Sequence, residues 1–176
     1  MSLEFRKAKM RDLETVCALV TSAVANMHSH SIEQWDELYP TADDLRADIE
    51  KSQMTLGEID GAPAVIFTLN QECEEEYASA DWARPDVPYL VLHRLCVSPQ
   101  FQHQGVARQT LHYIEETLPA GGIHALRLDA FSGNPFALRL YASLGYRNTG
   151  FADWRKGRFI LMEKYFGEDK DGDRQN

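Results

Sequence analysis

The chain has 176 residues, of which 44% are hydrophobic and 26% are charged, and this globular composition excludes wholesale disorder. A chain of this length is expected to form one domain whose core needs no metal ion or disulfide for folding. Its 18 Lys and Arg against 27 Asp and Glu give a net charge of −9, which disfavours nucleic-acid and membrane-surface partners.

The cysteines and the apolar runs indicate a cytoplasmic protein. Cys17, Cys73 and Cys96 are widely spaced, as expected for reduced thiols rather than for a disulfide framework or a zinc site. No apolar run approaches the ~20 residues of a membrane span, and the first residues lack the apolar core of a signal peptide. We therefore expect no metal site and no membrane partner.

The first third of the chain predicts a short strand followed by two helices. Leu3 and Phe5 alternate with polar residues, as in a strand with one buried face. Thr41 and Asp44 resemble a capping box, which opens a second helix that continues to about Lys51. Between the first strand and this second helix, apolar residues recur with the spacing of an amphipathic first helix, namely Leu13, Val16, Cys17, Val20, Val24 and Met27.

The middle of the chain predicts a hairpin, a loop and a buried strand. Residues 54–59 and 64–69 flank Asp60-Gly61, which is a typical hairpin turn. Residues 71–86 are acidic and show no period, so we expect a loop. Residues 89–97 are dense in β-branched and apolar side chains, which indicates a buried strand.

The last third predicts two more helices and three more strands. A third helix ends at residues 119–122, and a strand over residues 123–131 follows it. Asn134-Pro135 begins a fourth helix, and Gly145 ends it. The stripe of the third helix comprises Ala107, Leu111, Ile114 and Leu118, and the last two strands lie near residues 146–151 and 159–164.

The order of these elements predicts an α/β fold with a mixed sheet. Strands 89–97 and 123–131 are joined through a helix, so they must lie parallel to each other. The hairpin over residues 54–69 adds antiparallel strands, so the sheet is mixed.

One loop has the composition of an anion-binding site. Residues 97–108 run from the buried strand through Pro99 and Gly105 into the third helix. A helix N-terminus suits a phosphate group because its amides are unpaired, and Gly105 lets the backbone approach closely. An ordinary crossover loop explains the same residues equally well. The motifs of a P-loop and of a dinucleotide-binding fold are both missing.

Two motifs stand out, namely Gln102-x-x-Gly105-x-Ala107 after residues 95–97 and Asn134-Pro-Phe-Ala137-x-x-x-Tyr141-x-x-x-Gly145-Tyr146. Together they resemble the motifs of the GNAT acetyltransferase superfamily, with Ala107 in place of the commoner Gly, and the predicted element order over residues 3–164 matches this superfamily as well. The resemblance implies an acyl-CoA N-acyltransferase fold, with helices on both faces of a mostly antiparallel sheet and two splayed parallel strands at its centre. It also implies acetyl-CoA as the cofactor.

The resemblance further implies which residues contact acetyl-CoA. The backbone of residues 95–97 would pair with the pantetheine amides, and the amides of residues 102–108 would hold the pyrophosphate. Asn134 would contact the pantetheine arm. The implied cofactor-binding residues are Leu95, Cys96, Val97, Gln102, His103, Gln104, Gly105, Val106, Ala107, Arg108, Asn134 and Ala137.

Tyr141 is the candidate general acid. The register of the resemblance places it beside the sulfur, where a phenol could protonate a thiolate of similar basicity. The alternative is a core role, because Tyr141 lies on one helical stripe with Leu140 and Leu144.

His93 is the candidate base, with a pKa range suited to accepting a proton. If its strand is regular, it shares a face with Val91, Leu95 and Val97, which also allows a core role. Its position matches a histidine of the arylalkylamine acetyltransferases in the superfamily. The rival bases are Glu58, Asp129 and a chain of water molecules.

The acceptor is expected to bind near the first two helices and the acidic loop, since loops on a rigid scaffold carry recognition. Trp35, Tyr39 and Trp82 are candidate aromatic walls, although a core role is as plausible for each. Asp129 could bind a substrate ammonium, or it could pair with Arg94 or Arg127. Four glutamates of the acidic loop would favour a cationic amine if they face the cleft, and otherwise they are solvated surface charges. They are Glu72, Glu74, Glu75 and Glu76.

The leading hypothesis is an N-acetyltransferase that moves the acetyl group of acetyl-CoA to a primary amine by direct attack in a ternary complex. The amine could belong to a small molecule, an amino acid or a peptide N-terminus. The alternative is a non-catalytic acyl-CoA-binding or regulatory protein. We expect one acetyltransferase domain over residues 1–166 and a polar, flexible tail over residues 167–176. GNAT relatives are often dimers, so a homodimer is compatible with the resemblance.

Overall fold

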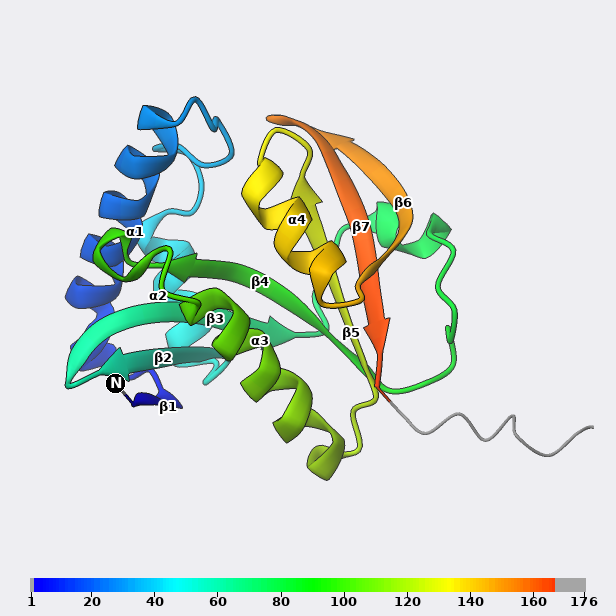
Figure 1. Ribbon diagram of the computed structural model, residues 1–176, viewed down its shortest axis with the longest axis horizontal. Coiled ribbons are helices and arrows are strands. Elements are labelled where there is room, and N and C mark those ends of the chain that lie inside the picture. Colours follow the sequence, from blue (N-terminus) through cyan, green and yellow to red (C-terminus); the bar gives the residue numbers. More distant parts are fainter. Residues whose placement is uncertain (1, 167–176) are drawn as a thin grey trace, which may run out of the picture.

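A single sheet of seven strands, in the order β1-β2-β3-β4-β5-β7-β6, organises the molecule (Figure 1). The computed structural model describes residues 2–166. Only β4 and β5 are parallel neighbours, so the predicted mixed, mostly antiparallel sheet is confirmed. The strands are β1 (Leu3–Lys7), β2 (Met54–Ile59), β3 (Ala62–Asn70), β4 (Tyr89–Val97), β5 (Ala125–Phe131), β6 (Arg147–Trp154) and β7 (Gly157–Tyr165).

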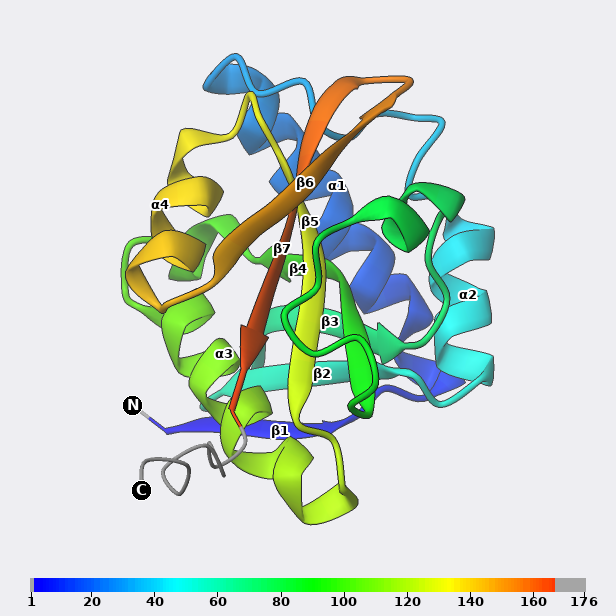
Figure 2. The same cartoon turned by 90° about the vertical axis from the view of Figure 1, so that its right-hand side faces the viewer.

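Helices cover both faces of this sheet, as expected. Figure 2 shows α3 and α4 on one side of the sheet and α1 and α2 on the other. The first pair packs on Phe67 and Leu128, and the second pair packs on Leu56 and Cys96. The helices are α1 (Leu13–Ser29), α2 (Ala42–Glu50), α3 (Val106–Thr117) and α4 (Pro135–Ser143), with 3-10 turns η1 (Met10–Asp12), η2 (Glu75–Ser79), η3 (Pro99–Phe101) and η4 (Leu118–Gly121).

Local sequence signals set several of these boundaries. Thr41 Oγ1 accepts a hydrogen bond from the Asp44 amide at 3.2 Å, and the Asp44 carboxylate accepts one from the Thr41 amide at 2.7 Å. This capping box starts α2 with Asp in place of the usual Glu. Asp60 and Gly61 both have positive φ, as a type I′ hairpin turn requires, so β3 begins directly after them.

The two central strands diverge. Residues 89–92 of β4 pair with residues 125–128 of β5, but β4 continues to Val97 and β5 to Phe131. Figure 1 shows them start side by side, after which β4 runs to the left and β5 upward. The predicted splay is therefore confirmed, and it leaves one edge of β4 without a neighbouring strand.

A bulge interrupts β4 within this splayed part. Arg94 adopts a left-handed φ of 52°, and the register with β3 shifts opposite it, between Ile66 and Thr68. A bulge inserts one extra residue into a strand and changes which side chains share a face.

The predicted tail over residues 167–176 lies outside the described residues. Within residues 2–166, no helix is both long and apolar enough to cross a bilayer.

Candidate active site

Two cavities meet at Tyr141, in the gap that the splayed strands leave. The small cavity, of about 270 Å³, lies between β4, the end of α1 and the start of α4. The large cavity, of about 630 Å³, extends from β4 toward the acidic loop and the β6–β7 turn. Tyr141 and Leu95 line both cavities.

The free edge of β4 forms one wall of the small cavity. Leu95, Cys96 and Val97 all line it, at positions where β4 has no partner in β5. The Cys96 thiol packs in the core under α1, and burial raises its pKa to about 12. Cys96 is therefore a packing residue rather than a nucleophile.

The loop before α3 closes the small cavity. Gly105 caps α3 with a left-handed φ of 78°, and His103 is also left-handed at 60°. Gln102 fixes the loop, because its side chain accepts a hydrogen bond from Asn26 at 2.8 Å and donates one to the Val97 carbonyl at 3.2 Å.

The structure separates the residues of this loop by what they can offer a ligand. The side chains of Gln102, His103 and Ala107 line the small cavity. The side chains of three further residues do not line it. Gln104 donates a hydrogen bond to the Gln100 carbonyl, and Val106 packs in the core. Arg108 donates one to Ser143 at 2.7 Å. Val106 is buried and can offer only backbone groups to the same ligand, whereas Gln104 and Arg108 are exposed side chains outside the cavity lining.

Helix α4 supplies the opposite wall. Asn134 caps it by accepting a hydrogen bond from the Ala137 amide at 3.1 Å, and Asn134 also donates to Gln34 at 3.1 Å. Tyr141 packs edge-on against Tyr146, so the expected core packing holds for its ring. Its hydroxyl forms no hydrogen bond within residues 2–166, and burial raises the pKa of this phenol. The hydroxyl therefore remains protonated at neutral pH.

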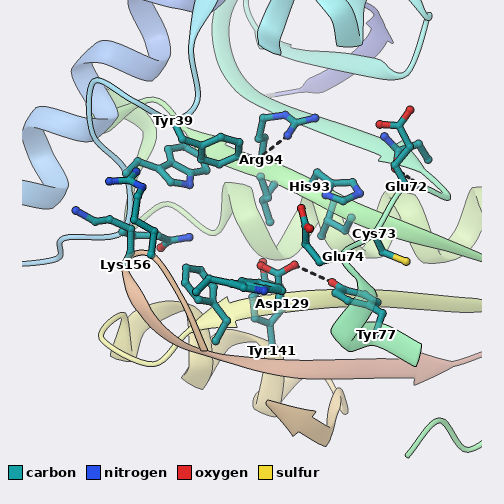
Figure 3. Close-up of a pocket in the computed structure, with 18 residues that line it drawn as sticks. Tyr39, Glu72, Cys73, Glu74, Tyr77, His93, Arg94, Asp129, Tyr141 and Lys156 are labelled. Atoms are coloured by element: carbon teal, nitrogen blue, oxygen red, sulfur yellow. Dashed lines mark hydrogen bonds between the residues drawn. The ribbon is translucent and has the colours of Figure 1, made fainter. Parts of the chain in front are cut away.

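Asp129 is a buried carboxyl in the large cavity. The Tyr77 hydroxyl donates a hydrogen bond to it at 2.7 Å (Figure 3). Burial raises the pKa of Asp129 to about 6, and the negative charge of Glu74 acts in the same direction. The expected alternative of an ion pair is wrong, because Arg94 binds Asp48 at 2.6 Å and Arg127 pairs with a different carboxylate.

His93 also lines the large cavity, but its side-chain direction does not follow the regular strand alternation that was predicted. The bulge at Arg94 leaves His93 on that side, whereas Leu95 and Val97 pack with Val106 under α3. The expectation of a face shared with Leu95 and Val97 is therefore wrong, whereas Val91 still packs against Tyr77 on the side of the large cavity. Burial lowers the pKa of His93, and the nearby charge of Arg94 lowers it further. Its Nε2 atom is buried and has no hydrogen-bond partner among the described residues.

Of the other residues predicted to bind the acceptor amine or to act as its base, some line the large cavity and others do not. Trp35 and Tyr39 line the large cavity, and the Tyr39 hydroxyl accepts a hydrogen bond from Arg94 at 2.7 Å. Trp82 instead lies over Arg127 at 4.3 Å and does not reach the cavity. Glu58 pairs with Arg6 at 3.0 Å and lines neither cavity, so the structure does not support it as a base.

The sequence from residue 24 to residue 146 matches the model of the Acetyltransferase (GNAT) family. The chain belongs to the GNAT family. The match spans both motifs and the elements that bring them to the small cavity. No curated protein sequence matches the chain.

Solved structures of acetyltransferases share the fold at low sequence identity. An acetyltransferase from Streptococcus agalactiae has a TM-score of 0.84 at 23% identity, over 94% of this chain and 96% of that one. PaiA N-acetyltransferase of Thermoplasma acidophilum, in complex with coenzyme A, has a TM-score of 0.71 at 20% identity, over 94% and 100%. YncA of Salmonella typhimurium, with its cofactor acetyl-CoA, has a TM-score of 0.69 at 18% identity, over 99% and 100%.

Several residues of this GNAT site were not predicted from the sequence. Tyr77, Trp154, Lys156 and Phe159 all line the large cavity, and Glu74 was expected there only conditionally. The available signal was the pair of aromatic residues in the acidic connection, Tyr77 and Trp82, of which only Tyr77 lines the cavity. No group of three or more His, Cys, Asp or Glu within residues 2–166 could hold a metal ion.

Proposed function

We propose that this GNAT protein is an N-acetyltransferase that transfers the acetyl group of acetyl-CoA to a primary amine. The observation that carries the proposal is the meeting of two cavities at Tyr141. One cavity would hold the acetyl donor and the other the amine. The reacting atoms would then meet beside a phenol.

The small cavity fits the donor in its backbone chemistry. The free edge of β4 over residues 95–97 can pair with the amides of the pantetheine arm. The amides of the first turn of α3 have no partner within the helix, and they suit a pyrophosphate. A left-handed Gly105 at the helix start turns the chain toward that position.

The large cavity fits an amine that must lose a proton before it attacks. An alkylamine has a pKa of about 10.4, so deprotonation at pH 7 costs about 4–5 kcal/mol at 1.36 kcal/mol per unit. Asp129 carries negative charge at neutral pH and would anchor the ammonium. His93 is neutral there, because its pKa is lowered, and its unpartnered Nε2 would accept the proton.

Tyr141 would complete the proton transfers. Acetyl-CoA supplies a thioester, in which the acetyl group is already activated for transfer. As the new C–N bond forms and the C–S bond breaks, the Tyr141 hydroxyl would donate its proton to the leaving sulfur. The attacking nitrogen would lose its second proton as the C–S bond breaks, and this proton would restore the Tyr141 hydroxyl. The first proton, taken by His93, would return to solvent, so the products are the amide and the free thiol.

The test separates donor binding from turnover. Acetyl-CoA at 100 times its dissociation constant adds about 2.7 kcal/mol of stability. This corresponds to a rise in melting temperature of about 5–10 °C, which ATP and NAD should not produce. In a thiol-release assay with a panel of amines, Tyr141→Phe should lose turnover by roughly 10²–10⁴ while keeping the melting shift.

The control is Tyr113→Phe, since Tyr113 stacks on Phe5 and lines neither cavity. It should keep both turnover and melting shift. A melting shift without turnover on any amine would favour the non-catalytic acyl-CoA-binding alternative. The absence of a shift at saturating acetyl-CoA would refute the donor assignment.

A further inference from the structure

The large cavity has excess negative charge on the side of the acidic loop. Glu74 and Asp129 both line it, and neither forms an ion pair within residues 2–166. The other acidic group there, Glu72, is neutralised by Lys51 at 2.8 Å. An ammonium group is the natural occupant of this side, because two carboxylates there have no cation of their own.

The opposite side has excess positive charge. Arg155 and Lys156, in the β6–β7 turn, both pair with Asp36, at 2.8 and 3.2 Å, and the exposed Glu37 adds a further attraction to Arg155. Neither of these two carboxylates lines the cavity. Both cations line the large cavity. In Figure 3, Lys156 lies on one side of the cavity and Glu74 on the other, with Asp129 and Tyr141 between them.

An unpartnered donor accompanies these cations. The Trp154 indole lines the cavity on the strand that leads into the same turn. Its Nε1–H is buried and forms no hydrogen bond with any residue that the structure describes. A buried donor without an acceptor is costly, so a ligand with an anionic oxygen would satisfy both Trp154 and the surplus cation.

We propose that the amine substrate also carries a carboxylate, so that the large cavity binds a dipolar molecule, an amino acid or a short peptide. Its ammonium would lie against Asp129 and Glu74, near Tyr141, and its carboxylate toward Lys156 and Trp154. A diamine would instead bring a second cation against Lys156. This inference rests on the proposed function and specifies its substrate class.

The experiment compares each substrate with its own amide. The substrates are L-phenylalanine and L-phenylalaninamide, and alanyl-phenylalanine and its amide, because the two lengths allow for different separations of charge. We expect Lys156→Met to lower kcat/KM by about tenfold for the acid of the preferred length and by less than twofold for its amide. Differences in amine pKa cancel, since each substrate is compared with itself across variants.

Two further variants fix the interpretation. Glu74→Gln should lower kcat/KM for acid and amide by similar factors, because it weakens the amine end alone. Lys9→Met, an exposed lysine that lines neither cavity, should change nothing.

The results distinguish this inference from the function on which it rests. If amines are acetylated but Lys156→Met affects acid and amide equally, the dipolar substrate is wrong and the N-acetyltransferase stands. A preference for 1,4-diaminobutane over both acids would overturn it in the same way. If no amine is acetylated although acetyl-CoA raises the melting temperature, the proposed function and this inference fail together.

Discussion

The buried Asp129 carboxyl costs the protein stability when it is charged. Its pKa in the folded protein is about 6 against an ordinary value of 3.8, chiefly because of burial. A raised pKa means that the folded state favours the proton, so this stabilisation is complete below pH 3.8 and is lost as the pH rises through 6. At 1.36 kcal/mol per unit, the charged form costs about 3 kcal/mol above pH 7.

Asp129→Asn should therefore stabilise the protein at high pH. Asn keeps an oxygen for the Tyr77 hydroxyl but carries no charge. In urea unfolding at pH 8, we expect the variant to gain about 3 kcal/mol over the wild type, and most of that gain to vanish at pH 4. The exposed Asp86→Asn should show no such pH dependence. A gain that is equal at both pH values would contradict the buried-charge explanation.

At the scale of the elements, the start of α3 depends on the backbone conformation of Gly105. A Cβ at Gly105 would meet only Gln109, at 3.8 Å, so space is available, but its φ of 78° is strained for any L side chain. We expect Gly105→Ala to cost about 1–2 kcal/mol of stability and to reduce the melting shift that acetyl-CoA produces.

Gly121→Ala is the matched control for that substitution. A Cβ at Gly121 also meets open space, but its φ lies outside the left-handed region. It should therefore be neutral or slightly stabilising, with an unchanged acetyl-CoA shift. Equal losses in both variants would show that the conformation of Gly105 is not what matters.

The elements themselves follow from local sequence, whereas the large cavity does not. Periodicity and capping residues placed β4, α2 and α4, because those signals act within a few residues. The bulge at Arg94 is different. The guanidinium binds Asp48 on α2, a partner 46 residues away, so the turn of His93 toward the cavity depends on tertiary contact.

At the scale of the whole molecule, four of the seven strands are linked by side chains at the end where the central strands still pair. There, Arg127 of β5 lies between the rings of Trp82 and Tyr89, at 4.3 and 3.8 Å. Glu163 of β7 pairs with Arg127 at 3.7 Å and with Arg147 of β6 at 3.2 Å. This network links four strands to the acidic loop, opposite the gap that holds the site.

Glu163 is the residue on which that network depends. It also accepts a hydrogen bond from the Ala83 amide, so its loss would release the acidic loop together with the two arginines. Arg127 is only 4% exposed, and removing one partner of a buried ion pair costs about 3–5 kcal/mol because the other charge stays buried.

Glu163→Ala should therefore lose about 3–5 kcal/mol in urea unfolding, whereas Glu116→Ala, on the exposed face of α3, should stay within about 0.5 kcal/mol of the wild type. A loss below about 1 kcal/mol would show that stacking on Trp82 and Tyr89 alone holds Arg127. In that case the ladder over residues 89–92 and 125–128 would suffice to close this end of the splayed sheet.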